Sequence, residues 1–402
     1  MAEISRREVL KIAGALGAGV LFVGSGCSPS ESRETLPGTA LRGGVATTTL
    51  TSQRSKEQNA MSKIHALYGF SPRLSPFQGL SAEEIVALLR DWGVHAIFGG
   101  YEDAAFVDAA HAAGLQVFAE FGCFVGERWW EKYLESRPVT ADGQLMPKQG
   151  WYAGVIPTLP AIRRELLANL GKLVVEKNVD GVWLDFIRWP TRWESPNPTL
   201  YQTSFDPQTL QFFQQDSGVR ISRELENAKD IAAWILAERA DAWRAWKCEQ
   251  ITSFVRQAAE VVKTARPPCL LGLFSVPWRR DDFDGAIIRI MGQDIAALAA
   301  YVDVFSPMVY HRLCGQPVSW IGAVTEHVHA LSRKPVWPII QTMSEPDELS
   351  ATEFGAAIEV ALGTPASFGV ILFTLKAVLE ENKLETMREG FASRRPDGNP
   401  GE

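Results

Sequence analysis

The segment Asp180-Gly181-Val182-Trp183-Leu184-Asp185-Phe186-Ile187-Arg188-Trp189-Pro190 places an ionisable carboxylate near the end of a strongly apolar stretch. Its Val, Trp, Leu, Phe and Ile side chains indicate a β-strand that is covered on both faces. Asp185 interrupts this stretch just before the exit at residues 188–190. A buried carboxylate is costly unless it has a partner or a function, so Asp185 is the first candidate for chemistry. In the alternative interpretation, Asp185 pairs with Arg188 and only holds the loop that follows.

Short apolar runs alternate with amphipathic helical patterns along most of the chain. Eight runs are predicted as strands: Ile64 to Phe70, His95 to Gly99, Gln116 to Phe121, Gly181 to Ile187, Leu270 to Val276, Val302 to Tyr310, Val336 to Gln341 and Phe368 to Thr374. Helical patterns include Ala82 to Trp92, Ala104 to Ala113, Ala161 to Lys177, Ile295 to Ala300, Val318 to Leu331 and Thr352 to Leu362. Such repetition predicts an α/β fold of the (β/α)8 TIM-barrel class. An open doubly wound sheet is the alternative, but no glycine fingerprint follows the first strand.

The composition fits one large globular domain, predicted over residues 63–390. Of the 402 residues, 46% are hydrophobic and 22% are charged, which is ordinary for a protein with a sizeable core. The net charge is −7, and the Lys and Arg residues are dispersed rather than gathered in a stripe. The chain therefore offers no basic field for nucleic acid.

The first 62 residues are predicted to serve export rather than the fold. Residues 5–11 resemble the twin-arginine motif, and residues 12–26 form a short apolar segment, so residues 1–27 are interpreted as a signal segment. Residues 23–27 resemble a lipoprotein processing site, which predicts a lipid at Cys27 as the one link to a membrane. Because Gly24 stands where a Leu is usual, cleavage without lipidation is the alternative. Residues 28–62 are predicted as a flexible linker and residues 391–402 as a disordered tail, which gives a periplasmic or cell-surface location.

No metal site and no cofactor are predicted. Beyond Cys27, the cysteines show no paired short spacing of the zinc or iron-sulfur kind, and a Cys248–Cys269 disulfide is left open. His327 and His329 are the only close histidine pair. Their spacing of two inside a helix points them to different faces, so both are predicted to be exposed.

Aromatic residues gather at or just after the predicted carboxyl ends of strands, where the loops of a barrel converge. They are Tyr68, Tyr101, Trp129, Trp130, Trp151, Tyr152, Trp189, Trp193, Trp278 and Tyr310. Sugars stack their C–H faces on aromatic rings, while their hydroxyl groups need polar side chains, so this mixture favours a carbohydrate cleft. In the alternative, about half of the rings cap the core, with Trp130 and Trp193 the first to be doubted.

Two segments resemble a known family. Asp180 to Pro190 has the form Asp-Gly-(apolar)-x-(apolar)-Asp-x-Ile-Arg-(aromatic)-Pro, and Val302 to His311 resembles the sixth-strand segment of the same proteins. These are the largely uncharacterised glycosyl-hydrolase-like (β/α)8 barrel lipoproteins of bacteria, and the likeness in layout extends over most of residues 63–390. A more distant likeness is to chitinase-type barrels. Those would place a Glu two residues after Asp185, where this chain has Ile187, so their mechanism is not implied.

A glycosidase of the common two-carboxylate kind needs a partner for Asp185. Glu120 is favoured, because an apolar setting at the end of the third strand could keep it protonated as an acid. The competitors are Glu102, Asp282 and Glu345, each in a polar loop. Asp303 begins the sixth strand and is predicted to be structural.

The predicted function is an exported glycoside hydrolase that acts on a cell-envelope or extracellular polysaccharide, with Asp185 and Glu120 catalytic. Substrate binding is assigned to Arg188, Tyr310, His311, Tyr68, Trp189, Trp278 and Gln341. The first alternative is a carbohydrate-binding barrel without catalysis, since the second carboxylate is open. The second is an envelope scaffold whose aromatic residues meet a protein partner.

Overall fold

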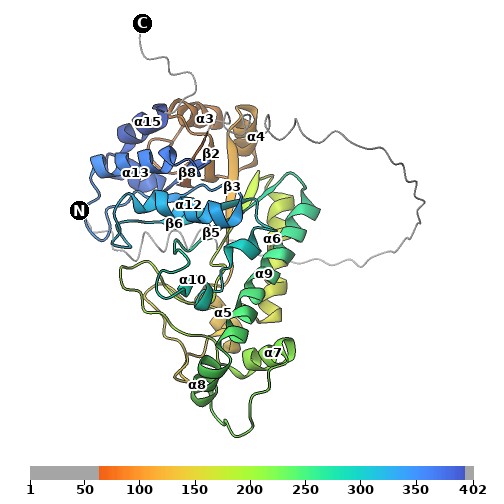
Figure 1. Cartoon of the computed structure of the whole chain (residues 1–402). Coiled ribbons are helices and arrows are strands. Elements are labelled where there is room, and N and C mark those ends of the chain that lie inside the picture. The colour runs from red at the N-terminus through yellow and green to blue at the C-terminus, as the bar shows by residue number, and fades with distance from the viewer. Residues whose placement is uncertain (1–62, 394–402) are drawn as a thin grey trace, which may run out of the picture. The chain divides into compact units, whose positions relative to one another are not determined.

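The computed structural model describes residues 63–393, which form a closed barrel of eight parallel strands in sequence order (Figure 1). The strands are β1 (Ile64–Phe70), β2 (Ala96–Gly99), β3 (Gln116–Gly122), β4 (Gly181–Asp185), β5 (Leu270–Ser275), β6 (Val304–Val309), β7 (Ile339–Gln341) and β8 (Gly369–Phe373). The register pairs β8 with β1 and so closes the sheet. The predicted (β/α)8 TIM-barrel class is confirmed.

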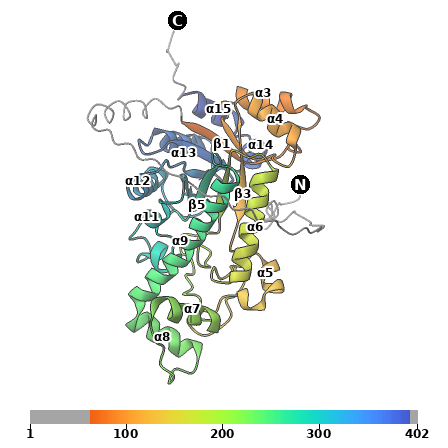
Figure 2. The same ribbon diagram turned by 90° about the vertical axis from the view of Figure 1, so that its right-hand side faces the viewer.

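Helices surround the barrel and also extend beyond it. They are α3 (Ala82–Asp91), α4 (Ala104–Ala112), α5 (Glu127–Lys132), the 3-10 helix η2 (Leu134–Ser136), α6 (Pro160–Glu176), α7 (Pro207–Ser217), α8 (Ala228–Glu238), α9 (Ala240–Ala265), α10 (Ala286–Arg289), α11 (Ile295–Leu298), α12 (Trp320–Ser332), α13 (Ala351–Gly363), α14 (Leu375–Glu380) and α15 (Leu384–Ala392). Figures 1 and 2 show α5, α7 and α8 beside the parts of α6 and α9 that are far from the strands.

The helices after β4 were not predicted, although the sequence marks their starts. The Asp206 carboxylate accepts a hydrogen bond from the Thr209 N–H at 2.9 Å, and Pro207 occupies the first turn of α7. The Asn227 side chain caps α8 in the same way. These are the residue types that begin helices. The chain between β4 and β5 contains no further strand, so a prediction built on alternating strands and helices does not find these helices.

Several strands are shorter than predicted, and the local backbone explains two of the differences. β4 ends at Asp185 rather than Ile187, because Phe186 has a φ of 54°, in the left-handed region that ends a strand. β6 ends at Val309. β7 begins only at Ile339, since Pro338 has no N–H to donate to a ladder, and Val336 forms isolated bridges instead.

An aromatic layer fills the barrel interior. The Trp183 ring contacts the rings of Phe98, Phe118 and Trp337 at centroid distances of 5.1, 4.6 and 5.3 Å. Its Nε1 donates to Ser306 Oγ at 3.0 Å, which satisfies the one polar group of the indole. Gly272 makes room for this ring, because a Cβ there would lie 2.1 Å from Trp183. This layer forms a rigid floor beneath the carboxyl ends of the strands.

Two aspartates join neighbouring strands at the opposite end of the barrel. Asp180, just before β4, accepts from the Val117 N–H of β3 at 2.8 Å. Asp303, just before β6, accepts from the Leu271 N–H of β5 at 2.8 Å. Asp303 also pairs with Lys263 at 2.7 Å. The predicted structural role of Asp303 agrees with these contacts.

The C-terminal boundary of the barrel domain lies two residues beyond the prediction. α15 continues to Ala392, and Phe391 is fully buried with its ring stacked on His65 at 4.3 Å. Residues 391 and 392 therefore belong to the fold rather than to a disordered tail. The predicted signal segment, linker and Cys27 lie outside the described residues, as do residues 394–402 of the predicted tail.

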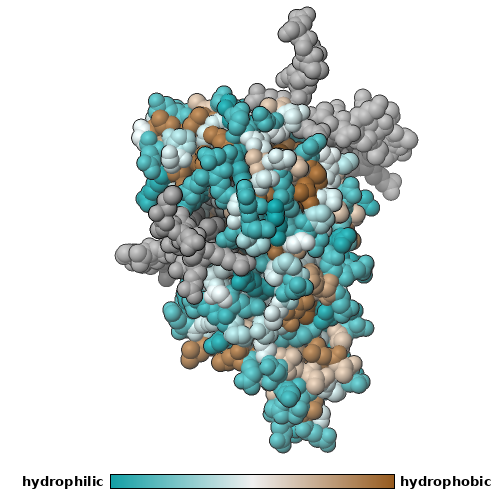
Figure 3. Space-filling view, turned by 90° about the vertical axis from the view of Figure 1, so that its left-hand side faces the viewer, coloured by the Kyte–Doolittle hydropathy of each residue, from teal (hydrophilic) through white to brown (hydrophobic). Residues whose placement is uncertain are grey.

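The surface of the described part is mostly polar on the face drawn in Figure 3, with hydrophobic residues in scattered groups. No helix within residues 63–393 is long and apolar enough to cross a membrane. Cys123, Cys248, Cys269 and Cys314 are buried thiols, so the open alternative of a Cys248–Cys269 disulfide is not realised.

Candidate active site

A cavity opens at the carboxyl ends of the strands, above the aromatic floor. Its cavity volume is about 50 Å³, and its empty space is about 780 Å³ when the open mouth is included. It is lined by Tyr68, Glu120, Trp151, Asp185, Phe186, Arg188, Arg192, Glu194, Phe274, Met308, Tyr310, Leu313, Ile339, Met343, Glu345 and Phe373. Both predicted catalytic carboxylates are in this set.

The strand pattern explains why Glu120 and Asp185 share the cavity. Phe118 and Trp183 point into the barrel on neighbouring strands, with their rings 4.6 Å apart. Glu120 and Asp185 follow them by two residues, and side chains two apart on a strand point to the same face. The register pairs Glu120 with Trp183 and Gly122 with Asp185. Both carboxylates therefore face inward, in the layer next to the mouth.

Burial raises the pKa of both carboxylates, but their surroundings differ. The pKa of Glu120 rises well above its usual value through burial and then through repulsion from Asp185. Burial raises the pKa of Asp185 to about 6, while the Arg188 cation and a hydrogen bond from Phe186 oppose that rise. Because the two carboxylates interact electrostatically, they titrate as a pair. The environment favours the proton on Glu120 and the charge on Asp185, which is the division that acid and base roles require.

The backbone just after Asp185 has a strained conformation. Phe186 is a non-glycine residue with a φ of 54°, and its N–H donates to Asp185 Oδ1 at 2.6 Å. Left-handed conformations of bulky residues cost free energy and occur preferentially at functional sites. The turn fixes the Asp185 carboxylate and brings the Phe186 ring into the cavity wall.

Arg188 is buried against the same turn, with a side chain 1% exposed. Its Nε donates to Thr191 O at 3.4 Å, and its guanidinium lies 4.9 Å from the Phe186 ring centroid and 5.5 Å from that of Tyr152. Nη1 lies 4.0 Å from Asp185 Oδ1 and has no hydrogen-bond partner. A buried N–H of this kind, on a residue that lines the cavity, is suited to a substrate oxygen.

Glu194 is a third carboxylate in the cavity that the sequence reasoning missed. It lies in the loop after β4, and its charge contributes to the raised pKa of Asp185. Arg192 approaches it, with Nε 3.6 Å from Glu194 Oε2. The signal in the sequence was its place between Trp193 and Pro196, in the loop that also carries Arg188.

Tyr310 lies among these carboxylates. Its pKa rises well above the usual value because it is buried and because Asp185, Glu194 and Glu120 repel the phenolate. The hydroxyl group therefore stays protonated and can act as a hydrogen-bond donor. The ring stacks between Trp193 at 5.8 Å and Phe373 at 5.1 Å, which fixes its position in the wall.

Tyr68 is the other predicted tyrosine in the cavity wall, and its ring contacts Phe373 at 4.8 Å. The remaining mouth aromatics divide by burial. Trp151 lines the cavity, Tyr101 lines an adjacent pocket, and Trp130 is half-buried with Nε1 donating to Gly154 O. The buried ones are Trp129, Tyr152, Trp189, Trp193 and Trp278. These five buried rings fit the alternative interpretation, in which about half of the aromatic residues cap the core.

Two tryptophans assigned to substrate binding are placed elsewhere. Trp189 is fully buried, and its Nε1 donates to Lys247 O at 3.0 Å, so no ring face is left for a sugar. Trp278 is 3% exposed, packs on Phe283 at 4.7 Å and does not line the cavity. Both follow strand ends in the sequence, but their loops turn the rings into the core.

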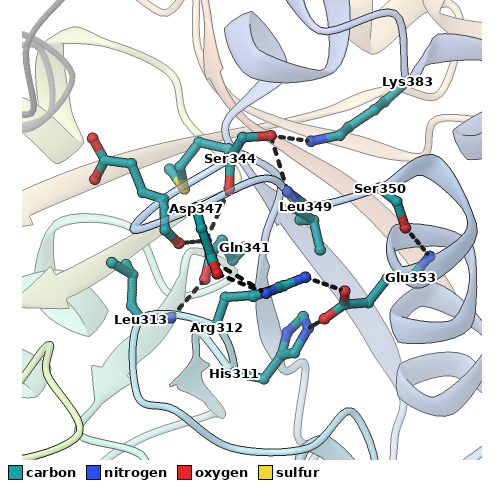
Figure 4. A network of polar contacts seen from close by, with 12 residues as sticks. His311, Arg312, Leu313, Gln341, Ser344, Asp347, Leu349, Ser350, Glu353 and Lys383 are labelled. Atoms are coloured by element: carbon teal, nitrogen blue, oxygen red, sulfur yellow. Dashed lines mark hydrogen bonds and ion pairs between the residues drawn. The ribbon is translucent and has the colours of Figure 1, made fainter.

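His311 and Gln341 lie behind the cavity wall in a polar network (Figure 4). His311 Nε2 bonds Glu353 Oε1 at 2.9 Å, and Arg312 Nη2 donates to Glu353 Oε2 at 2.7 Å. Burial lowers the pKa of His311. Gln341 Oε1 accepts from the Leu313 N–H at 3.2 Å, and its Nε2 donates to Met343 O at 2.8 Å. These two residues hold the loops after β6 and β7 instead of facing the cavity.

The three carboxylates that compete with Glu120 for the second catalytic role lie in different places. Glu345 lines the cavity. Glu102 pairs with Lys177 at 2.5 Å and lines the adjacent pocket, and Asp282 pairs with Arg279 at 3.0 Å. Within residues 63–393, no group of three His, Cys, Asp or Glu side chains could hold a metal ion. The predicted exposure of His327 and His329 is wrong, because both are half-buried and hydrogen-bonded.

Solved structures with this fold include glycoside hydrolases. The glycoside hydrolase domain of PgaB (BpsB) from Bordetella bronchiseptica matches with a TM-score of 0.60 and 13% identity, over 82% of this chain and 99% of that chain. A β-galactosidase from Marinomonas ef1 matches with a TM-score of 0.55 and 11% identity, over 78% of this chain and 54% of that one. α-L-Fucosidase isoenzyme 2 from Paenibacillus thiaminolyticus matches with a TM-score of 0.53 and 12% identity, over 82% and 49%.

The chain thus spans about half the length of the last two proteins. No protein-family model and no curated protein matches the sequence. At these identities the likeness establishes the shared fold alone.

Proposed function

We propose that this protein is an exported glycoside hydrolase that acts on a cell-envelope or extracellular polysaccharide. The observation that carries the proposal is the pair Glu120 and Asp185, two partly buried carboxylates on neighbouring strands whose surroundings separate their protonation. Hydrolysis of a glycosidic bond needs such a pair, one member as an acid and the other as a nucleophile or base. The glycoside hydrolases that share the fold add support.

In the proposed reaction, Glu120 donates its proton to the glycosidic oxygen while the bond to the anomeric carbon breaks. Asp185 acts at that carbon, either directly or by activating water. Arg188 and Tyr310 donate hydrogen bonds to the sugar, and the Phe186 turn keeps the Asp185 carboxylate in place. The wall is mostly apolar and aromatic, so it excludes water and strengthens these polar contacts.

The test is release of reducing sugar from a panel of bacterial and plant polysaccharides. Asp185→Asn and Glu120→Gln should each lower turnover by about 100-fold or more, in keeping with the loss of acid, base or nucleophilic catalysis. Asp282→Asn, outside the cavity, is the matched control and should leave turnover unchanged. Binding of a glycan without turnover by the wild type would instead support the alternative of a carbohydrate-binding barrel. If both variants keep full activity and full binding, the catalytic assignment of Asp185 and Glu120 is refuted.

Export is proposed from the Arg6-Arg7 pair and the short apolar segment after it. The double variant Arg6→Lys and Arg7→Lys should keep the precursor inside the cell, and normal export of that variant would contradict the proposal. Fatty-acid labelling of the wild type and of Cys27→Ala then decides whether the mature protein carries a lipid.

A further inference from the structure

A second pocket adjoins the cavity on the side of β1 and β2. It is lined by residues 69–73 at the end of β1 and just after it, and by residues 98–103 at the end of β2 and just after it. Tyr68 and Glu120 line this pocket and also the cavity. Its empty space is about 1120 Å³ with the mouth included. The two hollows therefore meet at Glu120, whereas Asp185 lines only the first.

Because of this arrangement, the two hollows would bind different parts of a substrate. The acid must reach the glycosidic oxygen, which belongs to the leaving saccharide, and the second carboxylate must reach the anomeric carbon. We infer that the second pocket holds the leaving saccharide and that the cavity holds the sugar that is attacked. This inference rests on the proposed function. It makes the protein an enzyme that binds sugar units on both sides of the bond that it cleaves.

The chemistry balances across that junction. Glu120 transfers its carboxylic proton to the glycosidic oxygen as the carbon–oxygen bond breaks, so the leaving saccharide departs with a hydroxyl group. The anomeric carbon bonds to the Asp185 carboxylate or to a water oxygen. In the first case, water then displaces Asp185 and returns its proton to Glu120. In the second case, Asp185 takes the proton of the attacking water.

The lining of the second pocket fits an uncharged saccharide. Glu102 is paired with Lys177, and Asp103 accepts from the Ala105 and Phe106 N–H groups at the start of α4. Arg73 adds a positive charge to the same lining. Burial raises the pKa of Tyr101 to about 12, so its ring keeps a neutral hydroxyl. An aromatic ring with a hydroxyl suits a sugar face and its hydroxyl groups.

Gly99 and Gly100 shape this pocket by bringing the turn after β2 close to β1. Their φ values of 121° and 74° favour glycine. A Cβ on Gly99 would lie 2.3 Å from Phe70 O, and one on Gly100 would lie 2.8 Å from the Phe70 ring. The turn therefore packs against Phe70, and Tyr101 follows directly at the pocket wall.

The test compares substrates that have a leaving saccharide with substrates that lack one. The probes are oligosaccharides of two to six units from the polysaccharide panel, and the α- and β-glycosyl fluorides of glucose, galactose and N-acetylglucosamine. Fluoride leaves without filling the second pocket. Tyr101→Ala should lower kcat/KM on oligosaccharides by about 10-fold, the scale of one lost aromatic contact, and should change kcat/KM on the fluoride by less than about twofold.

Ser71→Trp is a second variant, in which a large ring fills the pocket from the β1 side, and it should give the same split between the substrates. Tyr133→Ala is the matched control, a half-buried tyrosine that lines neither hollow. Equal losses on both substrates, or no loss on either, would overturn the inference while leaving the hydrolase intact.

Calorimetric titration of Asp185→Asn with the same oligosaccharides separates the two proposals. Affinity should rise with chain length until both hollows are filled, and addition of Tyr101→Ala should remove the last increment. Length-dependent binding without turnover by the wild type would refute hydrolysis, and with it the role of the second pocket as the site of a leaving saccharide. If no probe is bound or cleaved, both proposals fall.

Discussion

Arg188 Nη1 lies 4.0 Å from Asp185 Oδ1, and no hydrogen bond joins the two side chains. The contact is long for an ion pair, although Arg188 is buried and Asp185 is only 14% exposed. A structural anchor of that kind would be expected to form short, charge-assisted hydrogen bonds. The geometry is better explained by two charges that both face the cavity.

Asp185→Asn should make the folded protein more stable at neutral pH. Because burial raises the pKa of Asp185 from 3.8 to about 6, the folded state keeps a proton that the unfolded state loses over this range. Stability therefore falls as pH rises from about 3.8 to 6, and the full penalty of about 3 kcal/mol persists above pH 6. Urea unfolding at pH 7.5 should show a gain approaching that size, and at pH 3.5 almost none. A large loss at pH 7.5 would identify Asp185 as a structural anchor.

In the same unfolding experiment, Asp303→Asn should lower the stability of the folded protein instead of raising it. Asp303 accepts from the Leu271 N–H and pairs with Lys263 at the far end of the barrel. Its replacement should cost about 1 to 2 kcal/mol, the scale of a lost hydrogen bond to a charged group. Turnover per folded molecule should be unchanged, because the residue is far along the strands from the cavity. Loss of turnover without loss of stability would contradict this structural role.

The sequence predicted the barrel and its two central carboxylates because both follow from periodicity. Eight apolar runs specify the strands, and Glu120 and Asp185 stand out as charges within such runs. Periodicity does not predict the path of the loops. Trp189 and Trp278 follow strand ends as closely as Tyr310 does, yet their rings turn into the core. Glu194 enters the cavity from a loop whose path depends on tertiary contacts.

Arg188→Met and Glu194→Gln should move the acidic limb of the pH profile in opposite directions. Arg188 lowers the pKa of Asp185, and Glu194 raises it. In the proposed reaction Asp185 acts in its ionised form, so the limb should move to higher pH without the arginine and to lower pH without the glutamate. The measurement is kcat/KM against pH on a glycan that the wild type hydrolyses. Arg188→Met should also raise KM, because it removes the buried donor that we propose for the sugar.

Arg163→Met is the control for that pair. Arg163 is a largely buried arginine on α6 that donates to Ser253 and Gln250 of α9, away from the cavity. It should lower stability while leaving the pH profile in place. If Arg188→Met and Arg163→Met shift the acidic limb equally, the shift reflects a general loss of stability, and the electrostatic role of Arg188 is refuted.

Trp189→Ala and Trp151→Ala should separate stability from binding. Trp189 is fully buried and donates to Lys247 O, so its truncation leaves a cavity that should cost about 3 to 5 kcal/mol of unfolding free energy. Trp151 is half-buried and lines the cavity, so its loss should weaken glycan binding by about 10-fold, with a smaller effect on stability. Calorimetric binding and urea unfolding of both variants test this. If Trp189→Ala binds glycan more weakly but unfolds like the wild type, its ring reaches the substrate after all, and the division between core and cavity aromatics drawn from burial is wrong.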